Sequence, residues 1–212
     1  MRKAFSVMIL FFFCISLCLA PARALCIIED DEEYAVLVAL LFPNTPDDPE
    51  HVSDDEREAY LASVKVRLDG FHGGSYFIAD ETIPSNVAPE SSRPAGGDNP
   101  SHANACRISG DKLMAHVPPG RHVTLLSTEE VRRTFAGLGK SGGWEAFRKN
   151  HPLAGGITYL SRPVFNRDRT AAAVDARHQA DYHMGVGYQI RLEKSPKTGK
   201  WVITGTKMTR IS

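Results

Sequence analysis

The chain has 212 residues, of which 42% are hydrophobic and 24% are charged, and this is the composition of an ordinary globular protein. Its 25 basic residues balance 25 acidic ones, so the formal net charge is zero. This charge gives no indication of binding to nucleic acid or to an anionic membrane. A chain of this length can bury most of its apolar surface in one core. We therefore expect a single domain and no nucleic-acid partner.

Residues 1–24 have the pattern of a secretory signal peptide. Arg2 and Lys3 precede an apolar run from Val7 to Leu19, and Ala22-Arg23-Ala24 forms a small-x-small cleavage site. The apolar run would cover about 20 Å as a helix, which is short of the ~30 Å hydrocarbon core of a bilayer. We expect cleavage near Ala24, a secreted or periplasmic location, and no transmembrane segment in the mature chain.

The cysteines leave two questions open. The chain has four, and cleavage after residue 24 removes two of them. The remaining pair, Cys26 and Cys106, allows one disulfide in an oxidising compartment, and the alternative is two unpaired thiols. Cys26 also suggests a lipid anchor, but a lipobox has a small residue directly before its cysteine, and Leu25 stands there. Lipid anchoring at Cys26 is therefore disfavoured.

Two segments that follow the cleavage site predict helices. Residues 29–42 open with acidic side chains and continue with apolar residues at helical spacing, so the carboxylates lie at the positive end of the helix dipole. Residues 53–64 begin with a capping box and predict a short second helix. A strand is expected over residues 75–83, and residues 84–105, with four Pro and two Gly, predict a long loop.

The rest of the chain changes from helical to strand periodicity. A capping box opens a predicted helix over residues 127–138, glycines then interrupt the pattern, and residues 144–150 predict a short helix before Pro152. Four strand-like runs follow, with connections short enough for hairpins, at residues 157–166, 170–178, 184–193 and 200–211. We predict one α+β domain over residues 25–212, with helices packed on a C-terminal four-stranded antiparallel meander sheet.

The C-terminal half also carries a spaced motif. It runs through Trp144-x-x-Phe147, His151-Pro152, Gly156-Ile157, Leu160-Ser161-Arg162, Phe165-Asn166, Gly185-x-Gly187 and Lys200-Trp201. This order and spacing resemble a family of secreted or lipid-anchored bacterial proteins of uncharacterised activity, in which a W-F-YP-G-I-LSRVGFN segment precedes GxGyyvLL, WkV and a terminal wxS. The resemblance implies export and a compact α+β domain, and it implies no particular activity.

The chain departs from the family pattern at two places. The cysteines that many members carry before the paired glycines are absent, and His178 and His183 lie near that hairpin instead. Pro163 stands where the family has an ordinary strand residue before Phe165.

Few residues are candidates for chemistry. His178, Asp181 and His183 fall in one predicted hairpin loop and offer three zinc ligands, but the sequence supplies neither a fourth ligand nor a glutamate base beside them. Ser161 lacks the glycines of a nucleophile elbow, and no triad with visible spacing accompanies it. We therefore expect no catalytic residue, no metal and no cofactor.

The paired glycines at 185 and 187 predict a packing site. They lack the third glycine and the following helix of a dinucleotide-binding fingerprint. A strand without side chains at two positions allows a large ring to lie flat on it, and Trp144, one helical turn before Phe147, is the nearest candidate. We expect this helix to pack against the paired glycines.

These observations favour an exported, non-catalytic binding or structural module of the cell envelope. Its partner would be another envelope protein or a small ligand. The alternative is a secreted enzyme, a hydrolase or a metal-dependent one, with its site near the hairpin at residues 178–183. A pocket with convergent polar groups and a perturbed acid or base would favour the enzyme.

Overall fold

The computed structural model describes residues 26–43, 75–85, 105–137 and 139–211. The predicted signal peptide at 1–24, the predicted helix at 53–64 and almost all of the predicted loop at 84–105 lie outside these residues. The described residues form four helices, α2 (Asp31–Leu41), α4 (Gly110–His116), α5 (Thr128–Phe135) and α6 (Gly139–Asn150). They also form nine strands, β1 (Cys26–Ile27), β2 (Ser75–Ala79), β3 (Cys106–Arg107), β4 (His122–Leu126), β5 (Ile157–Leu160), β6 (Val164–Phe165), β7 (Ala171–Asp181), β8 (Met184–Lys194) and β9 (Trp201–Ile211).

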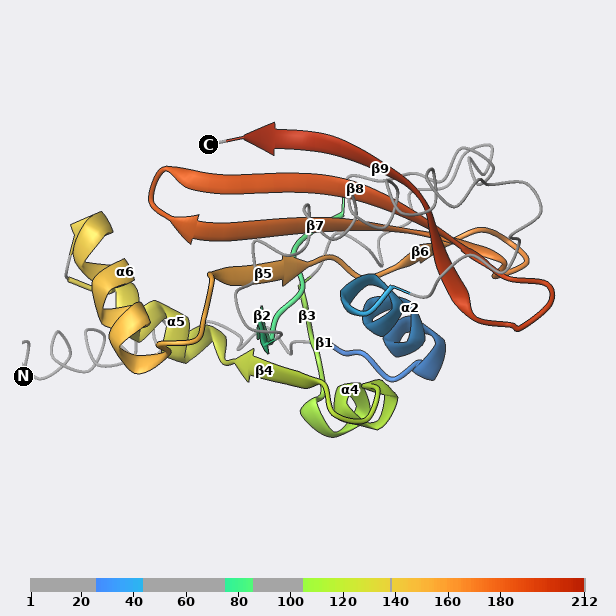
Figure 1. Ribbon diagram of the computed structural model, residues 1–212, viewed down its shortest axis with the longest axis horizontal. Helices are drawn as coiled ribbons and strands as arrows, with labels where there is room; N and C mark the ends of the chain where they lie inside the picture. The colour runs from blue at the N-terminus through green and yellow to red at the C-terminus, as the bar shows by residue number, and fades with distance from the viewer. Residues whose placement is uncertain (1–25, 44–74, 86–104, 138, 212) are drawn as a thin grey trace, which may run out of the picture.

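The main sheet is mixed and has seven strands, so the predicted four-stranded antiparallel meander is wrong as a description of it. Its order is β4-β2-β5-β7-β8-β9, and β6 pairs with the start of β7. The strands β5, β7, β8 and β9 are antiparallel neighbours, whereas β2 lies parallel to both β4 and β5. The chain crosses from β4 through α5 and α6 to β5 on the other side of β2 (Figure 1), and such a helical crossover is what parallel strands require.

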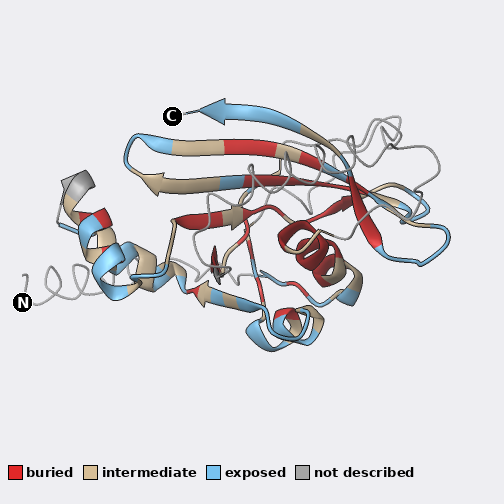
Figure 2. Ribbon diagram, in the orientation of Figure 1, coloured by how far each residue is buried: buried red, intermediate tan, exposed pale blue. Residues whose placement is uncertain are grey.

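Helices cover the two faces of the sheet at different places. On one face, α2 packs against apolar side chains from strands β2, β5, β7, β8 and β9, and Ile190 and Leu192 are completely buried there. On the other face, the buried and half-buried apolar side chains of α5 and α6 pack around Phe77 and Ile157, at the β4-β2-β5 end. Figure 2 shows the burial concentrated on α2 and the middle of β7 and β8, while the outer part of β9 is exposed. The second face of β7, β8 and β9 therefore carries no helix within the described residues.

The first helix follows its sequence pattern closely. Asp30 caps α2 by accepting a hydrogen bond from the Glu32 amide at 2.9 Å, and three acidic residues occupy the first turn. Tyr34, one turn on, donates its hydroxyl to the Ile28 carbonyl at 3.0 Å and accepts the Ser109 amide at 2.8 Å. The helix dipole and this buried hydroxyl together fix the N-terminal segment against the start of α4.

Several elements differ from the predicted ones. The run predicted at 157–166 is two strands, β5 and β6, which both pair with β7. Pro163 lies between them and has no backbone N–H to donate, so it interrupts the pairing with β7. Helix α6 starts at Gly139 rather than near Trp144, so the glycines do not interrupt it. The strand predicted at 75–83 ends at Ala79. The sequence patterns missed α4 and β4 altogether.

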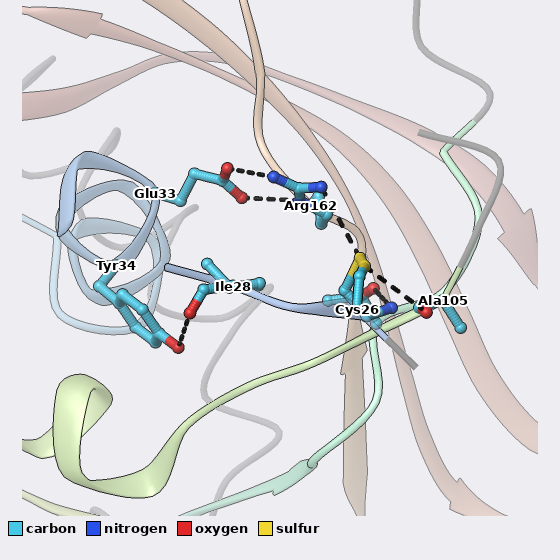
Figure 3. The surroundings of a disulfide bond; sticks show 8 residues. Cys26, Ile28, Glu33, Tyr34, Ala105 and Arg162 are labelled. Atoms are coloured by element: carbon cyan, nitrogen blue, oxygen red, sulfur yellow. Dashed lines mark hydrogen bonds and ion pairs between the residues drawn. A yellow bond between two sulfur atoms is a disulfide. The ribbon is translucent and has the colours of Figure 1, made fainter. Parts of the chain in front are cut away.

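A disulfide joins Cys26 of β1 to Cys106 of β3 (Figure 3), so the cysteines are paired rather than two free thiols. Their Cα atoms are 4.6 Å apart, and the two short strands pair in parallel. Beside the disulfide, the Arg162 guanidinium donates to both carboxylate oxygens of Glu33, at 2.9 and 2.5 Å, and its third nitrogen lies 3.7 Å from the Cys106 sulfur. The Glu33 side chain is 7% exposed, so this ion pair is largely withdrawn from water.

Among the residues that the structure describes, none of the helices is both long and apolar enough to cross a membrane.

Candidate functional site

A cavity of about 470 Å³ opens where α5 and α6 meet the sheet, and we call it the aromatic pocket. Four of its eight lining residues are aromatic, and they come from α5, α6, β5 and the turn after β7. Its lining residues are Val131, Arg132, Phe135, Gly137, Trp144, Tyr159, Gln179 and Tyr182. The volume lies in the range of sites for small molecules, which run from roughly 300 to 1,000 Å³.

Local sequence features place the two helices of this pocket. Ser127 caps α5 by accepting the Glu130 amide at 3.0 Å, as the capping box predicts. A carboxylate of Asp80, just after β2, accepts the Thr128 amide at 2.7 Å and so ties the start of α5 to the sheet. Gly143 lets α6 approach closely, because a Cβ at this position would collide with the Phe135 ring.

Behind the aromatic pocket, Trp144 and Phe135 of its wall belong to a cluster of packed rings. Trp144 is 4% exposed, and its ring lies edge-on to Phe135 at 5.0 Å and to Phe147 at 5.5 Å between centroids. Phe147 in turn contacts the imidazole of His151 at 5.0 Å, whose Nε2 lies 3.1 Å from a carboxylate oxygen of Glu130. Edge-to-face packing favours one orientation of the Trp144 ring against Phe135 and Phe147.

A second cavity, of about 280 Å³, continues along the same face of the sheet, and we call it the arginine pocket. Its lining residues are Ile83, Tyr159, Arg177, His178, Gln179, Gly185, Val186 and Arg210. The strand register explains its composition, because Tyr159, Arg177, Gly187 and Arg210 are successive cross-strand partners on β5, β7, β8 and β9. Directly opposed residues in antiparallel strands point to the same face, so the two arginines flank a glycine.

Tyr159 and Gln179 line both pockets, so the two cavities adjoin. Burial raises the pKa of the Tyr159 hydroxyl, which therefore stays protonated near pH 7 and remains a hydrogen-bond donor. His178 lies at the edge of the arginine pocket, where burial lowers the pKa of its imidazole. The ring is thus neutral near pH 7 and contributes no charge to the pocket.

The three residues named as weak metal candidates do not converge. His178 lies within β7 rather than in the turn, and its Nδ1 is 3.3 Å from the Thr158 hydroxyl. Asp181 forms an ion pair with Arg148 of α6 at 3.2 Å, and the Tyr182 amide and Arg148 together hold the pKa of its carboxyl below the ordinary value. His183 is exposed in the turn beside the Tyr182 ring. Within the described ranges, no group of three His, Cys, Asp or Glu side chains is placed to hold a metal ion.

Other residues of the C-terminal motif have structural contacts. The Ser161 hydroxyl is buried, accepting the Asp175 amide at 2.9 Å and donating to the Arg162 carbonyl at 3.0 Å. The Asn166 side chain accepts two backbone amides of the turn that leads into β7. The Trp201 indole donates to Glu32 of α2 at 2.9 Å and so fixes the helix to the hairpin.

Three further motif positions act at junctions. Pro152 follows the end of α6 and is exposed, and Gly156 precedes β5, where a Cβ would collide with the Gln179 carbonyl and the His178 ring. The Phe165 ring at the other end of the sheet packs under the Arg169 guanidinium, 4.1 Å from the ring centroid, and beside Trp201. These contacts explain much of the motif as turn and packing chemistry.

The expected packing of Trp144 on the paired glycines is not found at Gly187. The side chains nearest to a Cβ built on Gly187 are Thr209 and Arg210 of β9, and Trp144 packs with the rings around Phe77 and Phe147. The reason is the parallel crossover, which carries α6 to the β4-β2-β5 end of the sheet rather than over β8. Gly185 instead lines the arginine pocket, and Gly187 lies between Arg177 and Arg210 in the strand register.

Sequence patterns did not indicate the residues that matter most here. Local patterns place Phe135 in a helix and do not by themselves single out Tyr159, Arg177, Tyr182 or Arg210. A signal for the arginines exists, because each falls on the polar face of its predicted strand. Only the order of the strands shows that the two arginines lie on either side of the same glycine.

Comparison of the chain with protein-family models, with curated proteins and with solved structures finds no match.

Proposed function

We propose that the protein is an exported, non-catalytic binding module of the cell envelope, and that it takes a small ligand with an aromatic ring in the aromatic pocket. The signal-peptide pattern and the family resemblance of the C-terminal motif support export, as does the disulfide between the two cysteines of the mature chain. The alternative of a secreted enzyme has less support, because its candidate residues do not converge: His178 contacts Thr158, and Asp181 pairs with Arg148.

The observation that carries the proposal is the wall of the aromatic pocket. Phe135, Trp144, Tyr159 and Tyr182 come from separate parts of the chain and surround one cavity. An edge-on or offset ring between such side chains gains about 0.5 to 1.5 kcal/mol per aromatic contact beyond the burial of its surface. A ring-containing ligand is therefore the occupant that this wall favours.

The proposal is tested with 1-pyrenebutanol, a neutral aromatic probe that accepts excitation energy from tryptophan. Titration into the full mature protein should quench tryptophan emission and sensitise pyrene emission, because Trp144 forms part of the pocket wall. Tyr182→Ala, which removes an exposed ring of the wall, should weaken binding about threefold to tenfold.

Two matched controls make this experiment specific. His183→Ala changes the exposed neighbour of Tyr182, which does not line the pocket, and should leave the affinity unchanged. Trp201→Phe removes the other tryptophan, which packs in the core on the opposite face, and should preserve most of the energy transfer. Absence of saturable binding, or equal loss in the Tyr182 and His183 variants, contradicts the proposed function.

A further inference from the structure

We infer that the ligand carries an oxyanion, a carboxylate or a phosphate, which binds in the arginine pocket while its ring occupies the aromatic pocket. This inference rests on the proposed function and adds the chemical class of the ligand. It comes from the cross-strand row formed by Tyr159, Arg177, Gly187 and Arg210.

The first step is the spacing of the two guanidinium groups. Arg177 and Arg210 lie on strands separated by β8, so their backbones are about 10 Å apart, given a spacing of 4.7 to 4.9 Å between neighbouring strands. Both residues are exposed and line the same cavity. Arginine side chains are long enough to close this gap from both sides, and a planar guanidinium matches the geometry of an oxyanion.

The second step is the charge around the row. Neither Arg177 nor Arg210 forms an ion pair within the part of the chain that the structure describes. The nearest carboxylate on this face of β7 belongs to Asp175, two residues before Arg177, and it accepts a hydrogen bond from Ser85 at 3.2 Å. Two cations therefore share one cavity, and the lining residues that the structure describes include no carboxylate.

The third step is the glycine between the two arginines in the strand register. Gly187 has no side chain, and a Cβ there would meet the Thr209 hydroxyl at 3.0 Å and the Arg210 Cβ at 3.3 Å. A larger residue would therefore displace Arg210 and fill the space above the strand. A glycine between two arginines leaves room for a group that both side chains can reach.

The fourth step is the continuity of the two cavities. Tyr159 and Gln179 line both of them, and Tyr159 is the direct cross-strand partner of Arg177, so their Cβ atoms are about 5 Å apart. A short alkyl chain is thus long enough to connect a ring in the aromatic pocket to an oxyanion at the arginines. The side chains at this junction are polar: Tyr159 keeps its hydroxyl proton, and the Gln179 amide nitrogen donates to the Asp181 carbonyl at 3.5 Å.

The test compares 1-pyrenebutanoic acid with 1-pyrenebutanol on the full mature protein at pH 7.5. The two probes share the ring and the chain, and only the acid is charged. The acid should bind about tenfold more tightly, since a charge-assisted hydrogen bond at a partly exposed site contributes about 1.4 kcal/mol. Arg177→Gln and Arg210→Gln should each remove most of this preference, and raising the salt concentration should reduce it.

The control is Arg191→Gln, which removes the same charge from the same face of the sheet but lies outside both cavities. It should retain the tenfold preference, and circular dichroism should show that all three variants keep the wild-type secondary structure. Equal affinity for the two probes, or equal loss of preference in all three variants, overturns the inference and leaves the proposed function intact. Failure of both probes to bind overturns the proposed function and this inference with it.

Discussion

His178 shows how one residue's environment determines its role. As a residue of a predicted hairpin loop it would be solvated, but it lies in β7, with its ring against the Gly156 backbone and the Thr158 hydroxyl. Burial is the main cause of its lowered pKa, and a hydrogen bond to the Gly155 backbone opposes this only in part. The imidazole is therefore part of the packing between β5 and β7.

This placement predicts a pH dependence of stability. The pKa of His178 in the folded protein lies below the value of about 6.5 in the unfolded chain, so the unfolded state binds the proton first as the pH falls. The contribution to stability is fully present above pH 6.5 and is lost as the pH falls toward the folded pKa. Urea titrations at pH 7.5 and 5.0 should show a larger loss for the wild type than for His178→Gln. His183→Gln, in the exposed turn, should behave as the wild type, and identical pH dependence in all three proteins would contradict the assignment.

The ion pair between Glu33 and Arg162 is a second interaction that depends on burial. Removing one partner of a buried pair leaves an uncompensated charge, so Arg162→Met should lower the free energy of unfolding by about 3 kcal/mol. The double variant Glu33→Leu/Arg162→Met should recover much of this loss. For comparison, Arg148→Met breaks the half-exposed pair with Asp181 and should lower the free energy of unfolding by less than about 1 kcal/mol. Both values are measured by urea titration. A loss at Arg162 no larger than at Arg148 would show that Glu33 is solvated.

At the residue scale, the sequence predicts helix caps and turns better than it predicts contacts between residues far apart in the chain. Ser127 was expected as a helix cap from a local pattern, and it caps α5. Glu33 and Arg162 are separated by 129 positions, and a single sequence gives no signal for a contact at that distance. Residue pairs of this kind depend on strand order, which local spacing does not determine.

At the scale of elements, the helical crossover was the decisive omission. The C-terminal strands could be predicted because alternation and short turns are local signals. Helices at 127–138 and 144–150 were also predicted, but their role as the connection between the parallel strands β4 and β5 requires recognition of β4. That strand was missed because His122 to Leu126 form an edge whose side chains are mostly exposed or half-buried. The candidate site lies at this crossover, so it could not be predicted either.

Helix α6 gives a test of the packing at the site. An alanine normally stabilises a helix relative to glycine by about 1 kcal/mol, but a Cβ at Gly143 would collide with the Phe135 ring. Gly143→Ala should therefore destabilise the protein by about 1 to 3 kcal/mol in urea titration. In a Phe135→Ala background the same substitution should be neutral or stabilising. Stabilisation by Gly143→Ala in the wild-type background would mean that α5 and α6 do not pack as described.

At the scale of the whole molecule, the disulfide connects the N-terminal segment to the rest of the chain. Cys26 and Cys106 are 80 positions apart, and the bond holds β1 beside β3 next to the buried Arg162. If the signal peptide is cleaved after Ala24, Cys26 becomes the second residue of the mature protein. The bond would then fix the new N-terminus, which otherwise depends on a two-stranded pair and on the packing of α2.

This arrangement predicts that the stability of the protein depends on the compartment in which it folds. Closing a loop of this length contributes about 4 kcal/mol through the entropy of the unfolded chain. Mature protein isolated from an oxidising compartment should begin at Leu25 and should label at neither cysteine with an alkylating agent. Reduction, or the variant Cys26→Ser/Cys106→Ser, should lower the melting temperature by roughly 10 °C. The matched control is oxidised protein treated with the alkylating agent alone, which should melt as the untreated protein. Labelling of both thiols in protein that was never reduced, with an unchanged melting temperature in the double variant, would show that the N-terminal segment is held by packing alone.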